Sequence, residues 1–335
     1  IGVYLIMVYD PQIMFNDGFY DLIDARIPDG SLLHPKFPAA LGCRTHALSR
    51  LFDVMGGCLG QKSPELTTAA GYGTSPHLLY SGNDADDKFF FIMEIGYGGI
   101  PGRPIGDGMD GHSWWPLFTN IPTEYLESYC PMRVDRYSSV IDSGGAGRHR
   151  GGNGIDKWYT FLESGEIAIH DDRWLTPPWG ILGGKPGKRS TKILVHADGS
   201  RTVLPSKCDQ IKVEPGDQLI FQTAGGGGWG DPLTRETERV RYDVECGVVS
   251  AEAARECYGV ILSENRETPE VDEPATRSLR KKLVAQRGPL AAFDRGPYFD
   301  EVKRSGGIVW PDGWDDPDAP WSAEEGFLAA TGPAS

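Results

Sequence analysis

The stretch Asp142-Ser-Gly-Gly-Ala-Gly-Arg-His-Arg-Gly-Gly-Asn-Gly154 decides the architecture of this chain, because glycines surround an Arg-His-Arg core and a strand-like pattern lies on each side. Glycine adopts positive φ at no steric cost, so the backbone can fold tightly and turn several N–H groups toward one point. Arg148 and Arg150 stand beside these glycines. The motif therefore predicts a loop that either holds an anion or locks two sheets together.

A second glycine-rich run, Thr223-Ala-Gly-Gly-Gly-Gly-Trp-Gly-Asp-Pro-Leu233, precedes a predicted helix. Gly225, Gly227 and Gly230 formally match the dinucleotide-binding fingerprint. The strand before this run begins directly after a Glu-Pro-Gly-Asp turn, however, which indicates a hairpin rather than a parallel βαβ unit. Asp231 also places a carboxylate where a pyrophosphate would bind. We therefore expect a structural or interface loop here rather than a nucleotide site.

A basic turn over residues 184–190 is the other segment that looks like a phosphate loop. A Walker motif needs glycine where Leu182 stands, and it needs Ser or Thr where Arg189 stands. The sequence therefore predicts no ATP site on this chain.

Composition narrows the possible partners and compartment. The 335 residues include 44 glycines and 25 prolines, which favours short strands and turns over a helical bundle. A net charge of -14 argues against nucleic acid or an anionic membrane as partner, since both need a basic face. The six cysteines form no CxxC pair, and no apolar run has the length of a membrane span. We expect a cytoplasmic protein that binds proteins and small molecules.

Strand patterns dominate the middle of the chain, which predicts a β-rich α+β fold with antiparallel sandwich-like or barrel-like sheets, a few helices and an irregular C-terminal tail. We expect a mixed region over 1–132, a β-rich domain over 133–262 that ends in two helices, and an extended acidic tail over 263–335. Asp231 and Ser250 are the expected N-caps of those two helices. The predicted strands cover 3–9, 88–95, 134–141, 155–162, 166–170, 192–197, 210–213 and 218–222, and further helices are predicted over 44–59, 122–129 and 278–286.

The segment from His112 to Phe118 is the candidate substrate site. His112 can transfer protons near neutral pH, and Trp114, Trp115 and Phe118 can form an apolar wall for a flat ligand. Packing of these aromatic residues in the general core is the alternative interpretation.

The triplet Arg148, His149 and Arg150 is the candidate anion or interface site, because Arg binds carboxylates and phosphates bidentately. A hairpin that is salt-bridged to Asp142 or Asp156 is the alternative.

No metal site is predicted on this chain. His170 and Asp172 share one face at the end of a strand, but two ligands are too few for the three or four that zinc usually takes. A salt-bridged strand end is the expected arrangement. The histidines at 34, 46, 77 and 196 fall in no ligand spacing.

The two glycine runs, with Pro177-Pro178-Trp179-Gly180 between them, resemble the hydantoinase B/oxoprolinase family. Its members carry DSGGAGRxRGG-like, PPWG-like and GGGGWGDP-like segments in that order. They are usually longer, so we expect this chain to be the C-terminal portion of such a subunit or one piece of a split one. The resemblance implies that a family metal site would lie in the N-terminal half of such a subunit, which we expect this chain to lack.

The resemblance further implies one subunit of a heteromeric, ATP-dependent enzyme that is inactive alone. A hydantoinase A-type partner, with further copies of the complex, would bind ATP and Mg²⁺ and phosphorylate the substrate. The family includes carboxylases of ketones such as acetone or acetophenone, and hydrolases of hydantoins or 5-oxoproline. Relatives have a more polar His-Met-Thr-Asn-like run where this chain has its aromatic wall, which favours ketone carboxylation. Cyclic amide hydrolysis and a non-catalytic structural role are the alternatives.

Overall fold

The computed structural model describes residues 6, 10, 12–14, 16–21, 23–114, 118–263, 265, 269–299 and 304. Most of the predicted strand over 3–9, most of the predicted tail beyond residue 299, and Trp115 of the candidate substrate site lie outside these residues. In the described part of the chain, no helix is long and apolar enough to cross a membrane.

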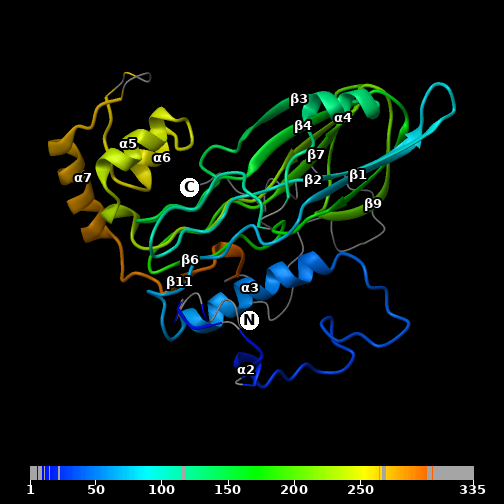
Figure 1. Ribbon diagram of the computed structural model, residues 1–335. Helices are drawn as coiled ribbons and strands as arrows, with labels where there is room; N and C mark the ends of the chain where they lie inside the picture. The colour runs from blue at the N-terminus through cyan, green and yellow to red at the C-terminus, as the bar shows by residue number, and fades with distance from the viewer. Residues whose placement is uncertain are drawn as a thin grey trace.

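Two antiparallel sheets form the centre of the molecule (Figure 1). One has four strands in the order β2-β1-β5-β9, which are β2 (Phe89–Ile95), β1 (His77–Asn83), β5 (Gly165–His170) and β9 (Lys207–Val213). The other has five strands in the order β3-β4-β10-β7-β8, which are β3 (Met132–Ser139), β4 (Ile155–Phe161), β10 (Gln218–Gln222), β7 (Thr191–Val195) and β8 (Arg201–Val203). A small third sheet pairs β6 (Gly180–Ile181) with β11 (Phe293–Asp294).

The main hydrophobic core lies between the two large sheets. Tyr80 of β1 is fully buried, and its ring centroid lies 4.8 Å from that of Phe161 in β4. Alternate residues of the strands point inward, as the buried Leu78 and Leu219 show. These contacts confirm the predicted α+β class with antiparallel, sandwich-like sheets.

Two buried ion pairs also join the sheets. Glu94 of β2 pairs with Lys157 of β4, and Lys192 of β7 pairs with Asp171, which follows β5. All four side chains are at most 3% exposed. A buried charge is tolerated when its partner is present, so each pair fixes how one sheet sits on the other.

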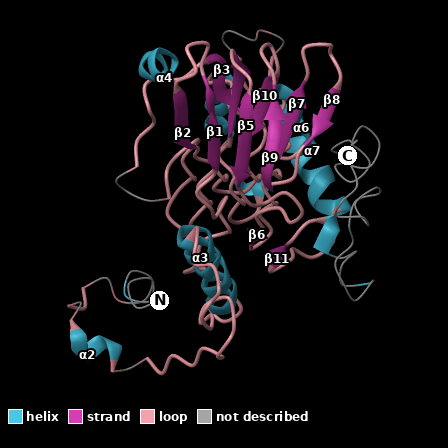
Figure 2. Ribbon diagram, turned by 90° about the vertical axis from the view of Figure 1, so that its right-hand side faces the viewer, coloured by secondary structure: helices cyan, strands magenta, loops and turns pink. Residues whose placement is uncertain are grey.

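The helices lie outside the sandwich, and α2 lies well away from the sheets (Figure 2). α3 lies below the sheets, whereas α5, α6 and α7 gather beside them. The helices are α2 (Asp17–Tyr20), α3 (Arg44–Gly60), α4 (Thr123–Tyr129), α5 (Thr237–Glu245), α6 (Ala251–Glu256) and α7 (Glu273–Gln286). α3 buries His46, Ser49, Gly56 and Gly60, while its apolar Leu48 and Phe52 are exposed.

One predicted helix boundary is wrong. Asp231 caps only a short 3₁₀ turn, η1 (Pro232–Thr234), by accepting a hydrogen bond from the Leu233 amide. Arg235 then adopts an extended conformation, so α5 begins at Thr237. The side chain of Arg235 is almost fully buried among carboxylates, and these contacts hold the break. The predicted cap at Ser250 is confirmed, since its side chain accepts from Ala253 N.

The glycine-rich runs interlock as extended segments that hydrogen-bond to each other outside any regular sheet. Gly226 N donates to Gly152 O at 2.8 Å, and Gly152 N donates to Ile100 O at 2.8 Å. A Cβ atom on Gly152 would lie 1.8 Å from Met109 O. Only glycine lets the backbones approach so closely. We call this assembly the glycine lattice, built from residues 98–102, 144–154, 180–187 and 225–230.

The three predicted regions along the chain stay a prediction. The structure adds that the first two share one sheet, because β1 pairs with β2 on one side and with β5 on the other. Hydrogen bonds of the glycine lattice also connect residues on both sides of position 132.

Candidate functional site

The candidate functional site surrounds α3, where the helix crosses the end of the four-stranded sheet. The segment 71–74 runs between them and is held by the helix. Arg50 Nε donates to Gly73 O at 2.7 Å, and Asp53 Oδ1 accepts from Gly71 N at 3.2 Å. Asp53 also binds the buried Arg173 at 2.5 Å. This network fixes the backbone between the predicted aromatic wall and a cluster of histidines.

Trp114 of the predicted aromatic wall is half-buried beside α3. Its ring stacks on Tyr72 with centroids 6.1 Å apart, and it lies 6.2 Å from Phe52 of the helix. Its backbone amide donates to the Tyr72 hydroxyl at 2.9 Å. The indole Nε1 is buried and meets no acceptor among the described residues. Trp114 therefore presents an apolar face and a buried donor at one place.

The other members of this predicted site are placed differently. His112 is exposed, and its Nδ1 lies 2.8 Å from the carbonyl oxygen of Ser113. Phe118 is 39% exposed. Trp115 lies outside the described residues. The role of His112, Trp114, Trp115 and Phe118 at a substrate site stays a prediction.

The Arg-His-Arg triplet divides into one exposed and one buried arginine. Arg148 is exposed. Arg150 binds Asp110 bidentately at 2.7 and 2.8 Å, and its Nε lies 3.3 Å from Asp243. His149 is half-buried, with its Nδ1 3.8 Å from a carboxylate oxygen of Asp107. The carboxylates at 110 and 243, rather than those at 142 or 156, are the partners of Arg150.

A second buried arginine completes this carboxylate network, and the sequence analysis missed it. Arg235 binds Asp107 bidentately at 2.6 and 2.8 Å and Asp243 at 2.7 Å. The network ties α5 to the glycine lattice. Its members come from distant parts of the chain, so no local motif marks them.

The amides of the second glycine run are occupied by the protein's own backbone, and the expected absence of a nucleotide site stays a prediction. The backbone amides of residues 225–230 all donate to backbone carbonyls, including Gly227 N to Ala70 O at 2.7 Å and Gly228 N to Lys185 O at 2.9 Å. A dinucleotide-binding turn needs such amides free for the pyrophosphate. The formal fingerprint therefore carries a structural role.

Three histidines meet at the end of α3 although their sequence spacing shows no motif. His46 Nε2 lies 3.3 Å from His77 Nδ1, and the His77 and His170 ring centroids lie 6.4 Å apart. His77 and His170 are register partners on β1 and β5, and His46 reaches them from the helix. Thr74 Oγ1, 2.6 Å from His46 Nδ1, orients that ring. We call His46, His77 and His170 the histidine cluster.

Burial keeps part of this cluster neutral. Desolvation, and then the neighbouring His46, lower the pKa of His77 to about 4. Burial also lowers the pKa of His46, although the nearby Asp172 acts in the opposite direction. Buried imidazoles lose the water that stabilises their charged form.

The predicted salt-bridged strand end is present at residues 170 to 172. His170 Nε2 lies 3.5 Å from Asp209, while Asp172 pairs with Lys207. Among the residues that the structure describes, no three His, Cys, Asp or Glu side chains are arranged to hold a metal ion.

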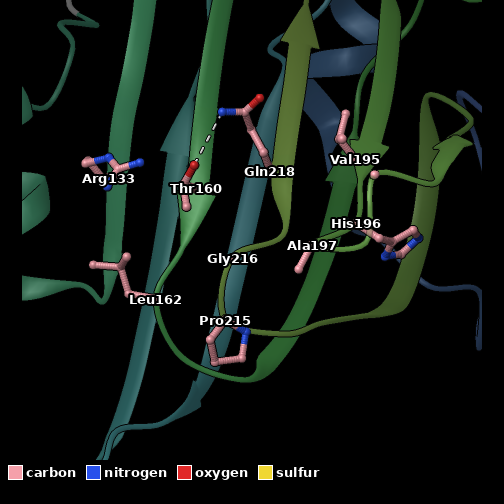
Figure 3. Close-up of a pocket in the computed structure, with 10 residues that line it drawn as sticks. Arg133, Thr160, Leu162, Val195, His196, Ala197, Pro215, Gly216 and Gln218 are labelled. Atoms are coloured by element: carbon pink, nitrogen blue, oxygen red, sulfur yellow. Dashed lines mark hydrogen bonds between the residues drawn. The ribbon is translucent and has the colours of Figure 1, made fainter.

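A separate pocket of about 550 Å³ opens on the outer face of the five-stranded sheet, at the end away from the glycine lattice (Figure 3). Arg133, Thr160 and Gln218 line it, and Gln218 donates to Thr160 at 3.4 Å. Arg133 and Thr160 both bind Asp135, so these polar groups already have partners. The pocket holds none of the predicted site residues.

Comparison with known proteins identifies the family. Residues 1–232 match the family described as hydantoinase B/oxoprolinase. The chain is 32% identical to the B-type subunit of a putative D-/L-hydantoinase from a Pseudomonas species, over 79% of this chain and 44% of that protein. It is 30% identical to the beta chain of the caprolactamase of Pseudomonas jessenii, over 83% of this chain and 50% of that protein. The chain thus spans about half the length of these curated relatives.

Solved structures show the same architecture. An ATP-dependent caprolactamase from Pseudomonas jessenii matches with a TM-score of 0.67 and 27% identity, over 84% of this chain and 50% of that chain. Nucleotide-free acetone carboxylase matches with a TM-score of 0.67 and 20% identity, over 91% of this chain and 46% of that chain. This chain belongs to the hydantoinase B/oxoprolinase family.

Proposed function

We propose that this member of the hydantoinase B/oxoprolinase family is part of the B-type subunit of a heteromeric, ATP-dependent enzyme that opens a cyclic amide. The observation that carries the proposal is the similarity, at 30% identity or more over most of this chain, to subunits named for hydantoin and caprolactam. Both rings contain an amide bond. The fold similarity to an ATP-dependent caprolactamase supports the ATP requirement.

Energetics explain why such an enzyme would use ATP. An amide carbonyl is a poor electrophile, and phosphorylation of its oxygen makes the carbon reactive toward water. The backbone amides of the second glycine run are occupied, so this chain offers no phosphate cradle there. We therefore assign ATP and Mg²⁺ to a hydantoinase A-type partner. A divalent metal, if the enzyme uses one, is assigned to the N-terminal half of the B-type subunit.

Trp114 is the residue through which this chain would contact the substrate. Its indole N–H is buried without an acceptor among the described residues, and Tyr72 and Phe52 border its ring. Because Nε1 is inaccessible to solvent, the accessible part of this half-buried ring would form an apolar contact with the substrate. His112 lies two residues away and is exposed, so it can exchange protons with solvent.

Ketone carboxylation through a phosphorylated enolate is the second candidate function. The apolar surroundings of Trp114 favour it, because a ketone has few polar groups to be recognised. The two candidates differ in the fate of the activated carbonyl, which either accepts water or acts as a nucleophile toward bicarbonate-derived CO₂.

The test is an assay of the complex purified with its native partner subunits. ADP release is measured with hydantoin, 5-oxoproline and caprolactam, and separately with acetone and acetophenone in the presence of labelled bicarbonate. Ring-opened product formed together with ADP supports the proposal. Label fixed into an acid-stable product supports the second candidate instead. A complex in which deletion of this chain leaves turnover intact would identify a non-catalytic structural subunit.

A further inference from the structure

A thiol, an imidazole and a carboxylate are aligned at the N-terminal end of α3. Cys43 Sγ lies 3.4 Å from His170 Nδ1, and His170 Nε2 lies 3.5 Å from Asp209 Oδ1. The three residues come from the N-cap of a helix, the last position of β5 and the middle of β9. We propose that Cys43 is a reactive nucleophile, with His170 as its general base and Asp209 as the group that orients His170. This inference does not depend on the ATP-dependent reaction.

Local backbone geometry places the thiol. Cys43 is the N-cap of α3 and has a left-handed conformation, with φ 51° and ψ 40°. Its side chain makes no capping hydrogen bond to the helix. The left-handed region is uncommon for residues other than glycine, and such residues concentrate at functional sites. Here the conformation turns Sγ away from the helix amides and toward His170.

A β-bulge places the carboxylate. β5 and β9 pair regularly as far as Ile167 and Ile211, and the register then shifts so that Ile169 pairs with Cys208. Gln210, within the shifted stretch, has φ 58°. Bulges re-aim side chains and are common beside active sites. This bulge lets Asp209 reach the ring of His170 at the end of the neighbouring strand.

The helix supplies the electrostatic part of the site. α3 has 17 residues, and the partial positive charge at a helix N-terminus stabilises a thiolate. The amide of His46 is occupied, because it donates to the Cys43 carbonyl at 3.0 Å. The helix therefore acts on the thiolate through its dipole. A long helix that begins at the nucleophile and an imidazole in contact with the sulfur are what thiol catalysis requires.

The reaction that follows is acyl transfer. His170 accepts the proton of the Cys43 thiol, and the thiolate attacks the carbonyl carbon of an ester. A C–S bond forms, and the C–O bond to the leaving alcohol breaks while His170 gives the proton to that oxygen. Water then attacks the thioester and His170 accepts its proton. The C–S bond breaks, His170 gives this proton to the sulfur, and a carboxylic acid and the free thiol remain. No oxidant, reductant or further cofactor is needed.

Solvent can reach the group. Cys43 is exposed, the side chain of His170 is 30% exposed, and that of Asp209 is 72% exposed. The other titratable groups that face the pair are His46 from α3, His77 from β1, Asp172 after β5 and Lys207 on β9. An electrophile can approach the sulfur without displacing the core.

Cys246 is a matched control within the same chain. It is also exposed, but it lies at the C-terminal end of α5, where the helix dipole disfavours a thiolate. The experiment alkylates the folded chain with limiting iodoacetamide in the presence of EDTA and quantifies each cysteine by peptide mass spectrometry. At about pH 6, roughly two units below the usual pKa of cysteine, we expect Cys43 to react at least ten-fold faster than Cys246.

Two variants identify the source of that reactivity. His170→Ala should slow alkylation of Cys43 about ten-fold and leave Cys246 unchanged. Asp209→Asn, at an exposed position where folding is preserved, should slow it about three-fold. Equal rates for Cys43 and Cys246 at every pH would overturn the proposal. An unchanged Cys43 rate in Asp209→Asn and His170→Ala together would also overturn it.

The acyl-transfer step has its own readout. Incubation with 4-nitrophenyl acetate should place an acetyl group on Cys43 that disappears with time, and Cys43→Ser should lose both the adduct and the rapid release of nitrophenol. Acetylation confined to lysines would refute the acyl-transfer step. ATP and partner subunits are absent from these assays, so failure of the proposed cyclic amide function would leave their outcome unaffected.

Discussion

The glycine lattice and the histidine cluster lie at the same end of the sandwich but are built in opposite ways. In the lattice, backbone meets backbone, and a Cβ atom on Gly99 would lie 1.9 Å from Gly152 O. In the histidine cluster, side chains from a helix and two strands meet, with imidazole nitrogens of His46 and His77 3.3 Å apart. The segments of the lattice meet at backbone contact distance, whereas the cluster brings together a buried His46 and a His170 that is 30% exposed.

The comparison shows that the most recognisable sequence motifs do not contain the side chains that are free to react. The glycine motifs dominate the sequence because close backbone packing tolerates no other residue. Their amides and the arginine between them are bound internally, to carbonyls and to Asp110 and Asp243. The histidines and Cys43 carry no motif, yet they form the group whose side chains remain able to react. The following predictions test that division, from the largest expected effect to the smallest.

The largest effect is expected from Gly152→Ala. The added methyl group would lie 1.8 Å from Met109 O, and the surrounding segments are backbone and cannot rotate aside. Overpacking usually costs 1–3 kcal/mol, and we expect a loss of about 3 kcal/mol or more, or no soluble protein. Gly288→Ala is the control, since nothing lies within 4 Å of its Cβ position. Equal melting temperatures of the two variants would show that the lattice is not rigid.

The next effect concerns the two arginines of the triplet. Arg150→Met should lower the free energy of unfolding by about 2–3 kcal/mol, because Asp110 loses its bidentate partner while Asp243 keeps its ion pair with Arg235. Arg150→Lys keeps the charge but loses the planar fork, so we expect a loss of roughly 1–3 kcal/mol and complex assembly or turnover several-fold lower.

Arg148→Lys is the matched control for this pair, because Arg148 is exposed and belongs to the same motif. Its effect should stay within about 0.5 kcal/mol in chemical denaturation. If Arg150→Lys behaved like Arg148→Lys, the bidentate contacts would contribute nothing to stability. If Arg148→Lys alone impaired complex assembly, the exposed arginine would be the interface residue that the sequence predicts.

Much of the fold could be predicted from local pattern. The strand over 218–222 and the helix that begins at Arg44 follow directly from apolar periodicity and punctuation. β1 was missed, although it is an inner strand of its sheet, because only Leu78, Leu79 and Tyr80 are apolar before Ser-Gly-Asn. The start of α5 was misplaced because contacts between Arg235 and distant carboxylates override the local helix signal.

The site was less predictable because its contacts are long-range. Arg150 could be identified as important from its motif, but its partner Asp110 lies in another segment of the chain. The histidine cluster depends on strand register between β1 and β5 and on the packing of α3. No spacing rule connects Cys43 with His170. A long helix that starts at an exposed cysteine is the one local signal that could have drawn attention to it.

A smaller effect should appear in the pH dependence of stability. The folded pKa of His77 is about 4, below the usual value near 6.5, so the unfolded chain binds this proton more tightly. Stability is therefore complete above pH 6.5 and is lost as the pH falls from 6.5 toward 4. Between pH 6.5 and 4, the free energy of unfolding of His77→Gln should therefore fall by roughly 1–2 kcal/mol less than that of the wild type. This figure allows for partial solvent screening. His34→Gln, at an exposed site, is the control, and identical pH profiles of the two variants would contradict the burial of His77.

The last prediction is that this chain alone does not bind ATP. A phosphate cradle at residues 225–230 would need amides that now donate to backbone carbonyls. Each such hydrogen bond contributes about 0.5–1.5 kcal/mol, so freeing all of them would consume most of the roughly 8 kcal/mol that a micromolar ligand provides. Calorimetry with ATP and Mg²⁺ should show no binding to the isolated chain but clear binding to its complex with the hydantoinase A-type partner. Micromolar affinity of the isolated chain would mean that the glycine lattice opens.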